Sequence, residues 1–196
     1  MLQFITIPDA AYSIAEQCQM AIEGTCQWIQ LHLPEGTDDS EVRELAAELV
    51  PLCKETATIL MLENRPELAQ ELGLHGVHIT LDSGLNAANI REQFGPEAII
   101  GVEVTEPSSI LALKGADIDY VTLPPFLSIE KRSEIVREAQ KGGNEMPVVF
   151  AGDFRIEDTP ETIAAGASGI CTGKYIVEAH DPVKYTEDLI KALRDR

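Results

Sequence analysis

The stretch ILMLENRPELAQELGLHGVHITLD, residues 59–82, has the pattern of a strand, a short helix and a second strand. Its first apolar run, Ile59–Leu62, has the length of a strand, and the nearby Pro66 favours the first turn of a helix. Gly73 ends the helical segment, and a second apolar run begins at Gly76. Such a unit is typical of parallel α/β folds, in which ligands bind at the carboxyl ends of the strands.

The same alternation continues on both sides of this stretch. The expected strands are residues 2–7, 28–33, 59–62, 76–79, 99–104, 120–123, 147–151 and 169–172. The expected helices are residues 12–23, 38–55, 66–73, 85–94, 106–113, 131–141, 159–166 and a last one from residue 181. Strict alternation indicates parallel strands with crossover helices. In a chain of 196 residues it predicts one (β/α)8 barrel domain over residues 1–196, with a doubly wound open sheet as the alternative.

Composition and charge narrow the classes of function. Hydrophobic residues make up 44% and charged residues 24%, as in ordinary soluble globular proteins. The formal net charge of −18 argues against nucleic acid or an anionic membrane as the main partner. No apolar run reaches the roughly 18 residues of a membrane helix, and the first residues lack the basic region of a signal peptide. We therefore expect a cytoplasmic protein, whose four cysteines are buried apolar residues without metal-ligand spacing.

Alternation along the strands places a ring of polar side chains inside the expected barrel. The inward-facing residues are Gln30, His32, Met61, Glu63, His78, Thr80, Glu103, Thr105, Tyr120 and Thr122. Polar groups deep in a barrel are costly unless they have partners, whereas an active site needs them at the carboxyl-terminal mouth. The ring therefore predicts an active site at the mouth.

Individual members of this region have possible chemical roles. Glu63 and Asp82 follow neighbouring strands, so their carboxylates could share a divalent cation such as Mg²⁺, or they could be a capping acid and a loop acid in solvent. His32 and His78 could transfer protons near neutral pH, or be barrel-interior histidines with satisfied hydrogen bonds. Arg65 is a cation beside the expected mouth, with a surface ion pair as the alternative.

Two loops have the features of a phosphate site. In barrels of this kind such sites form after the seventh and eighth strands, where Gly152 and Gly173 let backbone N–H groups approach an anion. Lys174 adds positive charge at the start of a short expected helix, whereas Asp153 opposes anion binding.

Several stretches, in order and spacing, resemble the thiamine phosphate synthase family, which also contains thiazole tautomerases. They are EGTCQWIQLHLPE (23–35), LENRPELAQELGLHGVHITLD (62–82), IIGVEVTEP (99–107), GADIDYVTLPPF (115–126), PVVFAGDF (147–154) and AAGASGICTGKYI (164–176). The resemblance implies a (β/α)8 barrel that joins hydroxymethylpyrimidine diphosphate to a thiazole phosphate, with Mg²⁺ on the diphosphate. It implies small phosphorylated substrates, and a homo-oligomer is compatible with it.

The family motifs match this chain unevenly. Gln30 keeps the glutamine of Gln-Leu-Arg-x-Lys, but both cations of that motif are replaced. Asn-Asp-Arg appears as Glu63-Asn64-Arg65, so Asn64 stands where the family has a metal-binding aspartate, and Asp82 matches the second such aspartate.

Beyond the fourth strand, the matches are weaker still. Glu103 replaces a serine, and the Thr-x-Thr-Lys loop is absent, with Lys131 nearest to its lysine. Gly152-Asp153 replaces Gly-Gly, and Lys174 replaces the serine after the eighth strand. The expected substrate-binding residues are thus Gln30, Asn64, Glu103, Lys131, Gly152, Gly173 and Lys174.

Three functions follow from this comparison. The first is thiamine phosphate synthesis with altered ligands, using Arg65 and Mg²⁺ at Glu63 and Asp82. The second is thiazole tautomerisation, which needs only proton transfer by His32 or His78. The third is non-catalytic binding of a phosphate or a thiazole.

Overall fold

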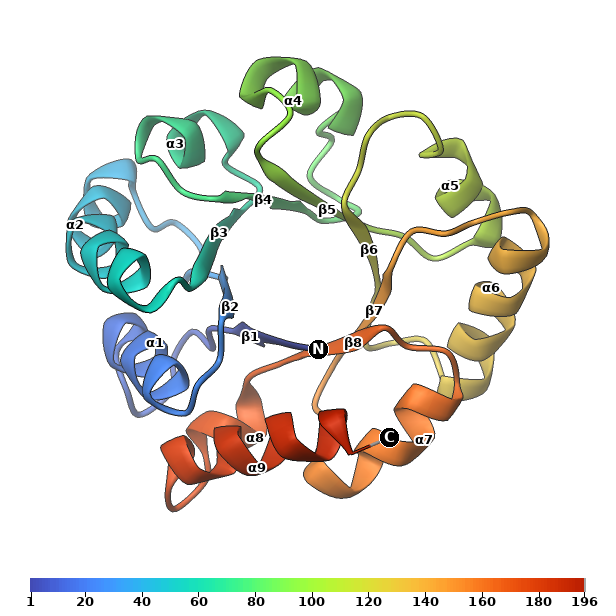
Figure 1. The fold of residues 1–196 in the computed structure, drawn as a ribbon. Helices are drawn as coiled ribbons and strands as arrows, with labels where there is room; N and C mark the ends of the chain where they lie inside the picture. The colour runs from blue at the N-terminus through green and yellow to red at the C-terminus, as the bar shows by residue number, and fades with distance from the viewer. Residues whose placement is uncertain (196) are drawn as a thin grey trace.

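The computed structural model describes residues 1–195 and shows eight parallel strands closed into a barrel (Figure 1). The strands are β1 (Leu2–Ile5), β2 (Trp28–Leu31), β3 (Ile59–Glu63), β4 (Gly76–Ile79), β5 (Ile99–Glu103), β6 (Tyr120–Leu123), β7 (Val148–Ala151) and β8 (Gly169–Thr172). Each strand pairs with the next, and β1 pairs with β8. The predicted (β/α)8 barrel is confirmed, and the open-sheet alternative is wrong because β1 and β8 close the ring.

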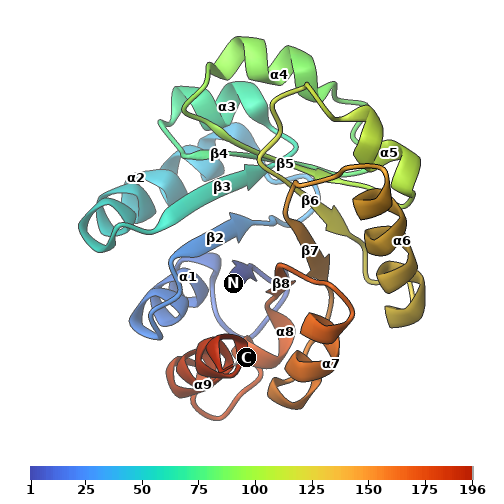
Figure 2. The ribbon, with the colours of Figure 1, turned by 45° about the vertical axis from the view of Figure 1, so that its right-hand side comes forward.

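Helices surround the barrel on all sides (Figures 1 and 2). They are α1 (Ile14–Glu23), α2 (Asp39–Thr56), α3 (Pro66–Glu71), α4 (Ala87–Phe94), α5 (Pro107–Ala112), α6 (Ile129–Lys141), α7 (Thr159–Ala164), α8 (Lys174–Val177) and α9 (Pro182–Arg194), with a 3₁₀ turn η1 (Ile156–Asp158). Local sequence explains several starts. Ser13 and Asp38 each form a capping box, with Glu16 and Glu41 respectively. Pro66 occupies the first turn of α3, as expected from its fixed φ.

The inside of the barrel has an apolar layer and a polar layer. The apolar layer consists of Trp28, Met61, Tyr120, Val149 and Cys171, and the Trp28 and Tyr120 rings meet edge to face with centroids 4.7 Å apart. Toward the mouth lie the buried polar side chains of Gln30, His78 and Thr122, while the buried Gln3 is level with Cys171. The predicted inward orientation of the strand residues is thereby confirmed for Gln30, Met61, His78, Tyr120 and Thr122.

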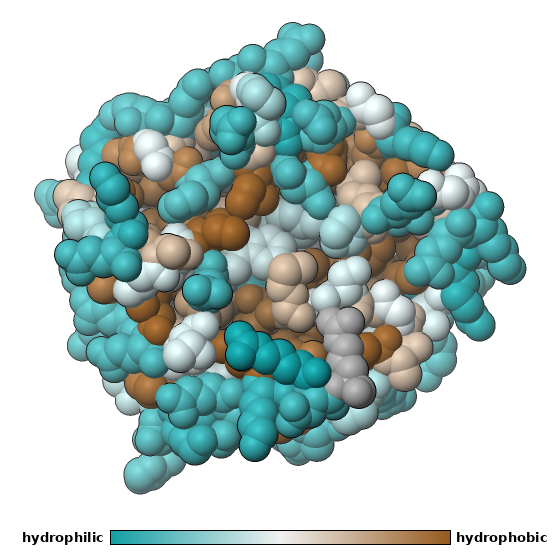
Figure 3. All heavy atoms as spheres, in the orientation of Figure 1, coloured by the Kyte–Doolittle hydropathy of each residue, from teal (hydrophilic) through white to brown (hydrophobic). Residues whose placement is uncertain are grey.

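Figure 3 shows hydrophilic residues around the rim of one face of the molecule, with apolar residues visible between them toward the centre. All four cysteines are free and buried, as predicted. Among residues 1–195, none of the helices combines the length and the apolar character needed to cross a membrane.

Candidate active site

A cavity of about 220 Å³ opens at the carboxyl-terminal mouth of the barrel. It is lined by Ile5, Ile7, Gln30, Glu63, His78, Thr80, Glu103, Thr122, Pro125, Ala151, Gly152, Asp153, Cys171 and Gly173. Six of the predicted site residues are in this set. A larger cavity of about 500 Å³ lies beside the amino ends of β6 and β7 and is lined by none of the predicted residues. The mouth cavity is therefore the candidate active site, since barrel enzymes place their chemistry at this end.

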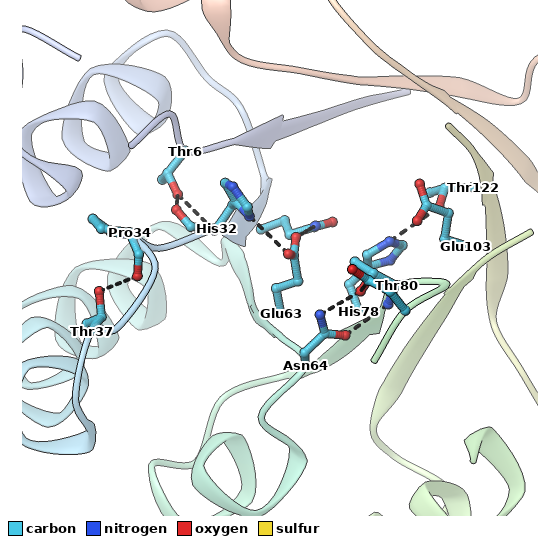
Figure 4. A network of polar contacts seen from close by, with 12 residues as sticks. Thr6, His32, Pro34, Thr37, Glu63, Asn64, His78, Thr80, Glu103 and Thr122 are labelled. Atoms are coloured by element: carbon cyan, nitrogen blue, oxygen red, sulfur yellow. Dashed lines mark hydrogen bonds and ion pairs between the residues drawn. The ribbon is translucent and has the colours of Figure 1, made fainter. Parts of the chain in front are cut away.

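Glu63 and His32 form an ion pair beside this cavity (Figure 4). Glu63 ends β3, and its Oε1 lies 2.9 Å from Nδ1 of His32, while its Oε2 accepts a hydrogen bond of 2.8 Å from Gln30. Thr6 fixes the backbone of His32, because its hydroxyl accepts from the His32 N–H and donates to the His32 carbonyl. His32 is thus held against Glu63, although it does not itself line the cavity.

The pair shifts the pKa values of both partners. The hydrogen bond to Glu63 raises the pKa of His32, and the negative charge of Glu63 adds to this effect against partial burial. Burial acts to raise the pKa of Glu63, but the hydrogen bond and charge of His32 bring that pKa below its usual value. The two shifts agree in sign, so each partner stabilises the charged form of the other.

A hydrogen-bonded network runs beneath the cavity from β1 and β2 through β4 to β6. Gln3 donates through Nε2 to Gln30 Oε1 at 3.1 Å and to the Tyr120 hydroxyl at 2.9 Å. The Tyr120 hydroxyl lies 3.2 Å from Nδ1 of His78, and Nε2 of His78 lies 3.3 Å from the Thr122 hydroxyl. Because Tyr120 accepts from Gln3, its own proton can be donated to Nδ1 of His78 or to the Met61 sulfur at 3.7 Å.

His78 is a neutral side chain in this network. It is 4% exposed, and burial lowers its pKa to about 4, although the charge of Glu63 acts in the opposite direction. The prediction that His78 lies in the barrel interior with satisfied hydrogen bonds is confirmed. The same imidazole also lines the cavity.

Asn64 and Asp82 lie outside the cavity lining and tie together the loops after β3 and β4. Asn64, with φ of 55°, donates to the Thr80 hydroxyl at 2.6 Å and accepts from the Thr80 N–H at 2.9 Å. The Thr80 hydroxyl in turn donates to Asp82 at 2.9 Å. Both ends of the Asn64 carboxamide are hydrogen-bonded to Thr80. The predicted contact of Asn64 with substrate therefore requires these hydrogen bonds to break.

The residues predicted to bind Mg²⁺ are already engaged with other groups. Both carboxylate oxygens of Glu63 have partners, His32 and Gln30, and Asp82 accepts from Thr80. Within residues 1–195, no group of three or more His, Cys, Asp or Glu side chains is arranged to hold a metal ion. These residues do not make a metal site by themselves, and Mg²⁺ at Glu63 and Asp82 stays a prediction.

The three predicted cations lie around the mouth but not in the cavity lining. Arg65 pairs with Asp39 at 3.5 Å and donates to the Thr37 carbonyl, which is the surface ion pair given above as the alternative. Lys131 pairs with Glu134 at 3.1 Å, and Lys174 pairs with Asp153 at 3.5 Å. Each cation turns toward an exposed carboxylate of its own neighbourhood, which the strand pattern does not predict.

The cavity wall combines carboxylates with two close-fitting glycines. Burial raises the pKa of Glu103, and the charges of Glu63 and Asp82 raise it further, against a hydrogen bond from the Leu81 N–H. Gly152 has a φ of 151°, which favours glycine, and any Cβ at position 173 would overlap the Ile5 carbonyl oxygen. The predicted glycine loops therefore both reach the cavity.

Gln3 belongs to the hydrogen-bonded network beneath the cavity, although it is absent from the inward-facing residues predicted from the sequence. It lies one residue before Phe4 in β1 and is fully buried, and its Oε1 has no hydrogen-bond partner. The alternation used for the other strands also applies to residues 2–7, in which Gln3 is the polar residue on the face of Ile5.

Two comparisons by sequence identify the family, and a third, by structure, agrees on the fold. The profile described as "Thiamine monophosphate synthase" matches residues 2–176. The proteins named "Thiamine-phosphate synthase" from Bacteroides fragilis and Bacteroides thetaiotaomicron are each 33% identical, covering 96% and 98% of this chain and 98% and 97% of their own lengths. In fold, the chain is similar to "Thiamine phosphate pyrophosphorylase from Pyrococcus furiosus", with a TM-score of 0.84 at 22% identity over 99% of this chain and 95% of that one. By sequence, this chain belongs to the thiamine monophosphate synthase family.

Proposed function

We propose that this protein acts in thiamine biosynthesis and couples hydroxymethylpyrimidine diphosphate to a thiazole phosphate in the mouth cavity. The thiazole nitrogen forms a bond to the methylene carbon of the pyrimidine. The C–O bond to the diphosphate breaks, and its electron pair leaves with the diphosphate. The observation that carries the proposal is that a whole-chain family match coincides with a cavity built from the family's motif positions.

The cavity offers distinct surroundings for a ring and for a phosphate. Gly152 and Gly173 both line the cavity and place there the two loops that barrels of this kind use for a phosphate, and the Gly152 N–H donates to the Cys171 carbonyl at 3.0 Å. Gln30 and His78 offer hydrogen bonds to ring substituents, while Ile5, Ile7 and Pro125 supply apolar contacts that exclude water. Gln30 and His78 would thus bind and orient the substrate, and the hydrogen-bonded network already holds both side chains in place.

The negative charge of the mouth must be offset when a diphosphate binds. The ion pairs of Arg65, Lys131 and Lys174 involve exposed carboxylates, and such pairs are worth only ~0–1 kcal/mol each. The cations can therefore exchange their carboxylate for a diphosphate at little cost.

A second candidate is proton transfer on a thiazole, as in the tautomerase members that the sequence resembles. It is favoured by the His32–Glu63 pair, whose Nδ1–Oε1 distance of 2.9 Å leaves Nε2 of His32 available for a substrate proton. This reaction requires no cation for a leaving group, so the carboxylate-lined cavity suits it directly.

Two incubations separate the two reactions. Purified protein is mixed with both substrates, with and without Mg²⁺, and thiamine phosphate is measured by chromatography and mass spectrometry. In a second incubation, the thiazole tautomer that a tautomerase would convert is mixed with the protein alone in D₂O. NMR follows its conversion to the other tautomer. Thiamine phosphate that accumulates with time supports the coupling reaction. Isomer conversion without any thiamine phosphate supports the second candidate and excludes the first.

We also propose a cytoplasmic location and leave the homo-oligomer as a prediction. The phosphorylated substrates are charged and cross a bilayer only with difficulty, so the enzyme should work where they are made. Size-exclusion chromatography with light scattering tests the oligomeric state.

A further inference from the structure

Arg132 is a buried cation without a carboxylate partner in the part of the chain that the structure describes. It lies in the first turns of α6 and is 4% exposed, and no carboxylate oxygen of residues 1–195 approaches within 4.0 Å. Its Nη2 donates to the Pro124 carbonyl at 2.8 Å, while its Nε has no hydrogen-bond partner. The adjacent Lys131 is the opposite case, because it is exposed and paired with Glu134.

The surroundings place this charge directly behind the cavity wall. The guanidinium carbon lies 5.4 Å from the centroid of the Phe150 ring and 5.7 Å from that of Phe154. A Cβ built on Gly152 would be 3.8 Å from Nη2 of Arg132. Gly152 lines the mouth cavity, and so does Pro125, which follows the Pro124 whose carbonyl accepts from Nη2. The guanidinium therefore lies behind the part of the wall that these two residues form.

A buried arginine without a carboxylate partner lowers the free energy of unfolding when no ligand is bound. Burial lowers the pKa of Arg132, yet an arginine keeps its charge in proteins. An unpaired buried charge lowers stability, and two aromatic faces offset only part of that effect. The position also belongs to the buried face of α6, with Ile135, Val136 and Ala139, where an apolar residue would pack without this cost.

We propose that Arg132 supplies the positive charge that allows an anion, a phosphate group of the substrate, to bind at Gly152. It is a positioning residue that acts through the cavity wall, where low dielectric leaves its charge weakly screened. It offsets the carboxylates of Glu63, Glu103 and Asp153, which line the same cavity. The proposal rests on the proposed function only in assuming a phosphorylated substrate.

The alternative role is purely structural, as a clamp between α6 and the aromatic rings of β7 and its loop. The two roles differ in what a variant should lose. A clamp that is removed lowers stability and leaves anion binding intact. A charge that is removed weakens anion binding, while a buried apolar replacement leaves stability unchanged or higher.

The test titrates ¹⁵N-labelled protein with inorganic phosphate and follows the amide of Gly152 by NMR. The variants are Arg132→Met, which keeps bulk without charge, Arg132→Lys, which keeps charge, and Lys141→Met, at the exposed C-terminal end of the same helix, as the control. We expect Arg132→Met to weaken phosphate binding at least tenfold, or ~1.4 kcal/mol. Arg132→Lys should stay within a few-fold of the wild type, and Lys141→Met should match the wild type. Thermal unfolding of each variant is recorded alongside, and Arg132→Gln replaces Arg132→Met if the latter does not fold.

Three results would overturn the proposal. They are unchanged phosphate binding in Arg132→Met, an equal loss in Lys141→Met, and no shift of the Gly152 amide in the wild type. Because the titration needs neither substrate nor turnover, it is independent of the coupling assay. A protein that binds phosphate through Arg132 but makes no thiamine phosphate would refute the proposed function alone.

Discussion

Nδ1 of His32 and Oε1 of Glu63 are 2.9 Å apart at the mouth of the barrel, joining the loop after β2 to the end of β3. The His32 pKa is raised and the Glu63 pKa is lowered, so the charged pair extends over a wider pH range than either group alone would allow. Gln30 and Thr6 hold the two partners from either side. The pair is therefore a fixed source of both a proton and a negative charge beside the cavity.

Replacing Glu63 by Gln should lower the pKa of His32. The hydrogen bond to the carboxylate is the largest cause of the raised value, and a neutral amide cannot stabilise the imidazolium in the same way. NMR titration of the His32 ring measures the change, with Glu103→Gln as a control on a carboxylate that also lines the cavity. An unchanged His32 titration in Glu63→Gln would show that the pair does not form in solution.

His78 should make the protein lose stability as the pH falls. Its folded pKa of about 4 is below the ordinary value of 6.5, so the unfolded chain binds more protons between these values. Its contribution is complete above about pH 6.5 and decreases as the pH falls toward 4, by ~3 kcal/mol in all. Denaturant unfolding at several pH values measures it.

The variant His78→Gln should lose less stability over the same pH range than the wild type. His180→Gln, at an exposed position, should behave as the wild type does. Comparing variants at each pH removes the contribution of the carboxylates, which titrate in all of them. Parallel curves for the wild type and His78→Gln would contradict a buried neutral His78.

Removing the Tyr120 hydroxyl should destabilise the barrel. Tyr120→Phe leaves Nδ1 of His78 without its Tyr120 partner, and it removes one of the two acceptors of the Gln3 amide. An unsatisfied buried polar group costs ~1–3 kcal/mol. Urea unfolding of the variant at neutral pH checks this value. A variant as stable as the wild type would show that these hydrogen bonds do not stabilise the barrel.

Alanine at Gly173 should disrupt the loop after β8. The added Cβ would overlap the carbonyl oxygen of Ile5, so β1 or the loop must move. Gly36→Ala is the matched control, since it has a positive φ of 83° and no atom within 4 Å of an added Cβ, and it should cost only ~1–2 kcal/mol. Thermal unfolding should rank Gly173→Ala well below Gly36→Ala, and the reverse order would contradict the packing described for β8.

The barrel and the inward faces of its strands could be predicted from the sequence, because side chains alternate strictly along a strand. Gln30, Glu63 and His78 were placed at the mouth on this ground alone. The directions of loop and helix side chains could not be predicted in this way, since no period governs them. Lys131 was expected to bind substrate from its distance to a motif, whereas the adjacent Arg132 is the residue that turns inward.

The hydrogen-bond partners of the site residues could not be predicted from the sequence either. The register of β2 and β3 brings Gln30 and His32 to the carboxylate of Glu63, and alternation along one strand does not predict these partners. Mg²⁺ at Glu63 and Asp82 stays a prediction. Asn64 has a left-handed backbone conformation and uses its side chain on Thr80. Such pairings depend on three-dimensional proximity between neighbouring strands.

The central claim is that the mouth cavity forms thiamine phosphate from its two precursors. A single-turnover reaction tests it most directly, with enzyme in excess over hydroxymethylpyrimidine diphosphate, thiazole phosphate present, and ³¹P NMR following the diphosphate. The account predicts stoichiometric release of diphosphate with equal formation of thiamine phosphate. No diphosphate release from the folded wild type, at any enzyme excess, would contradict it.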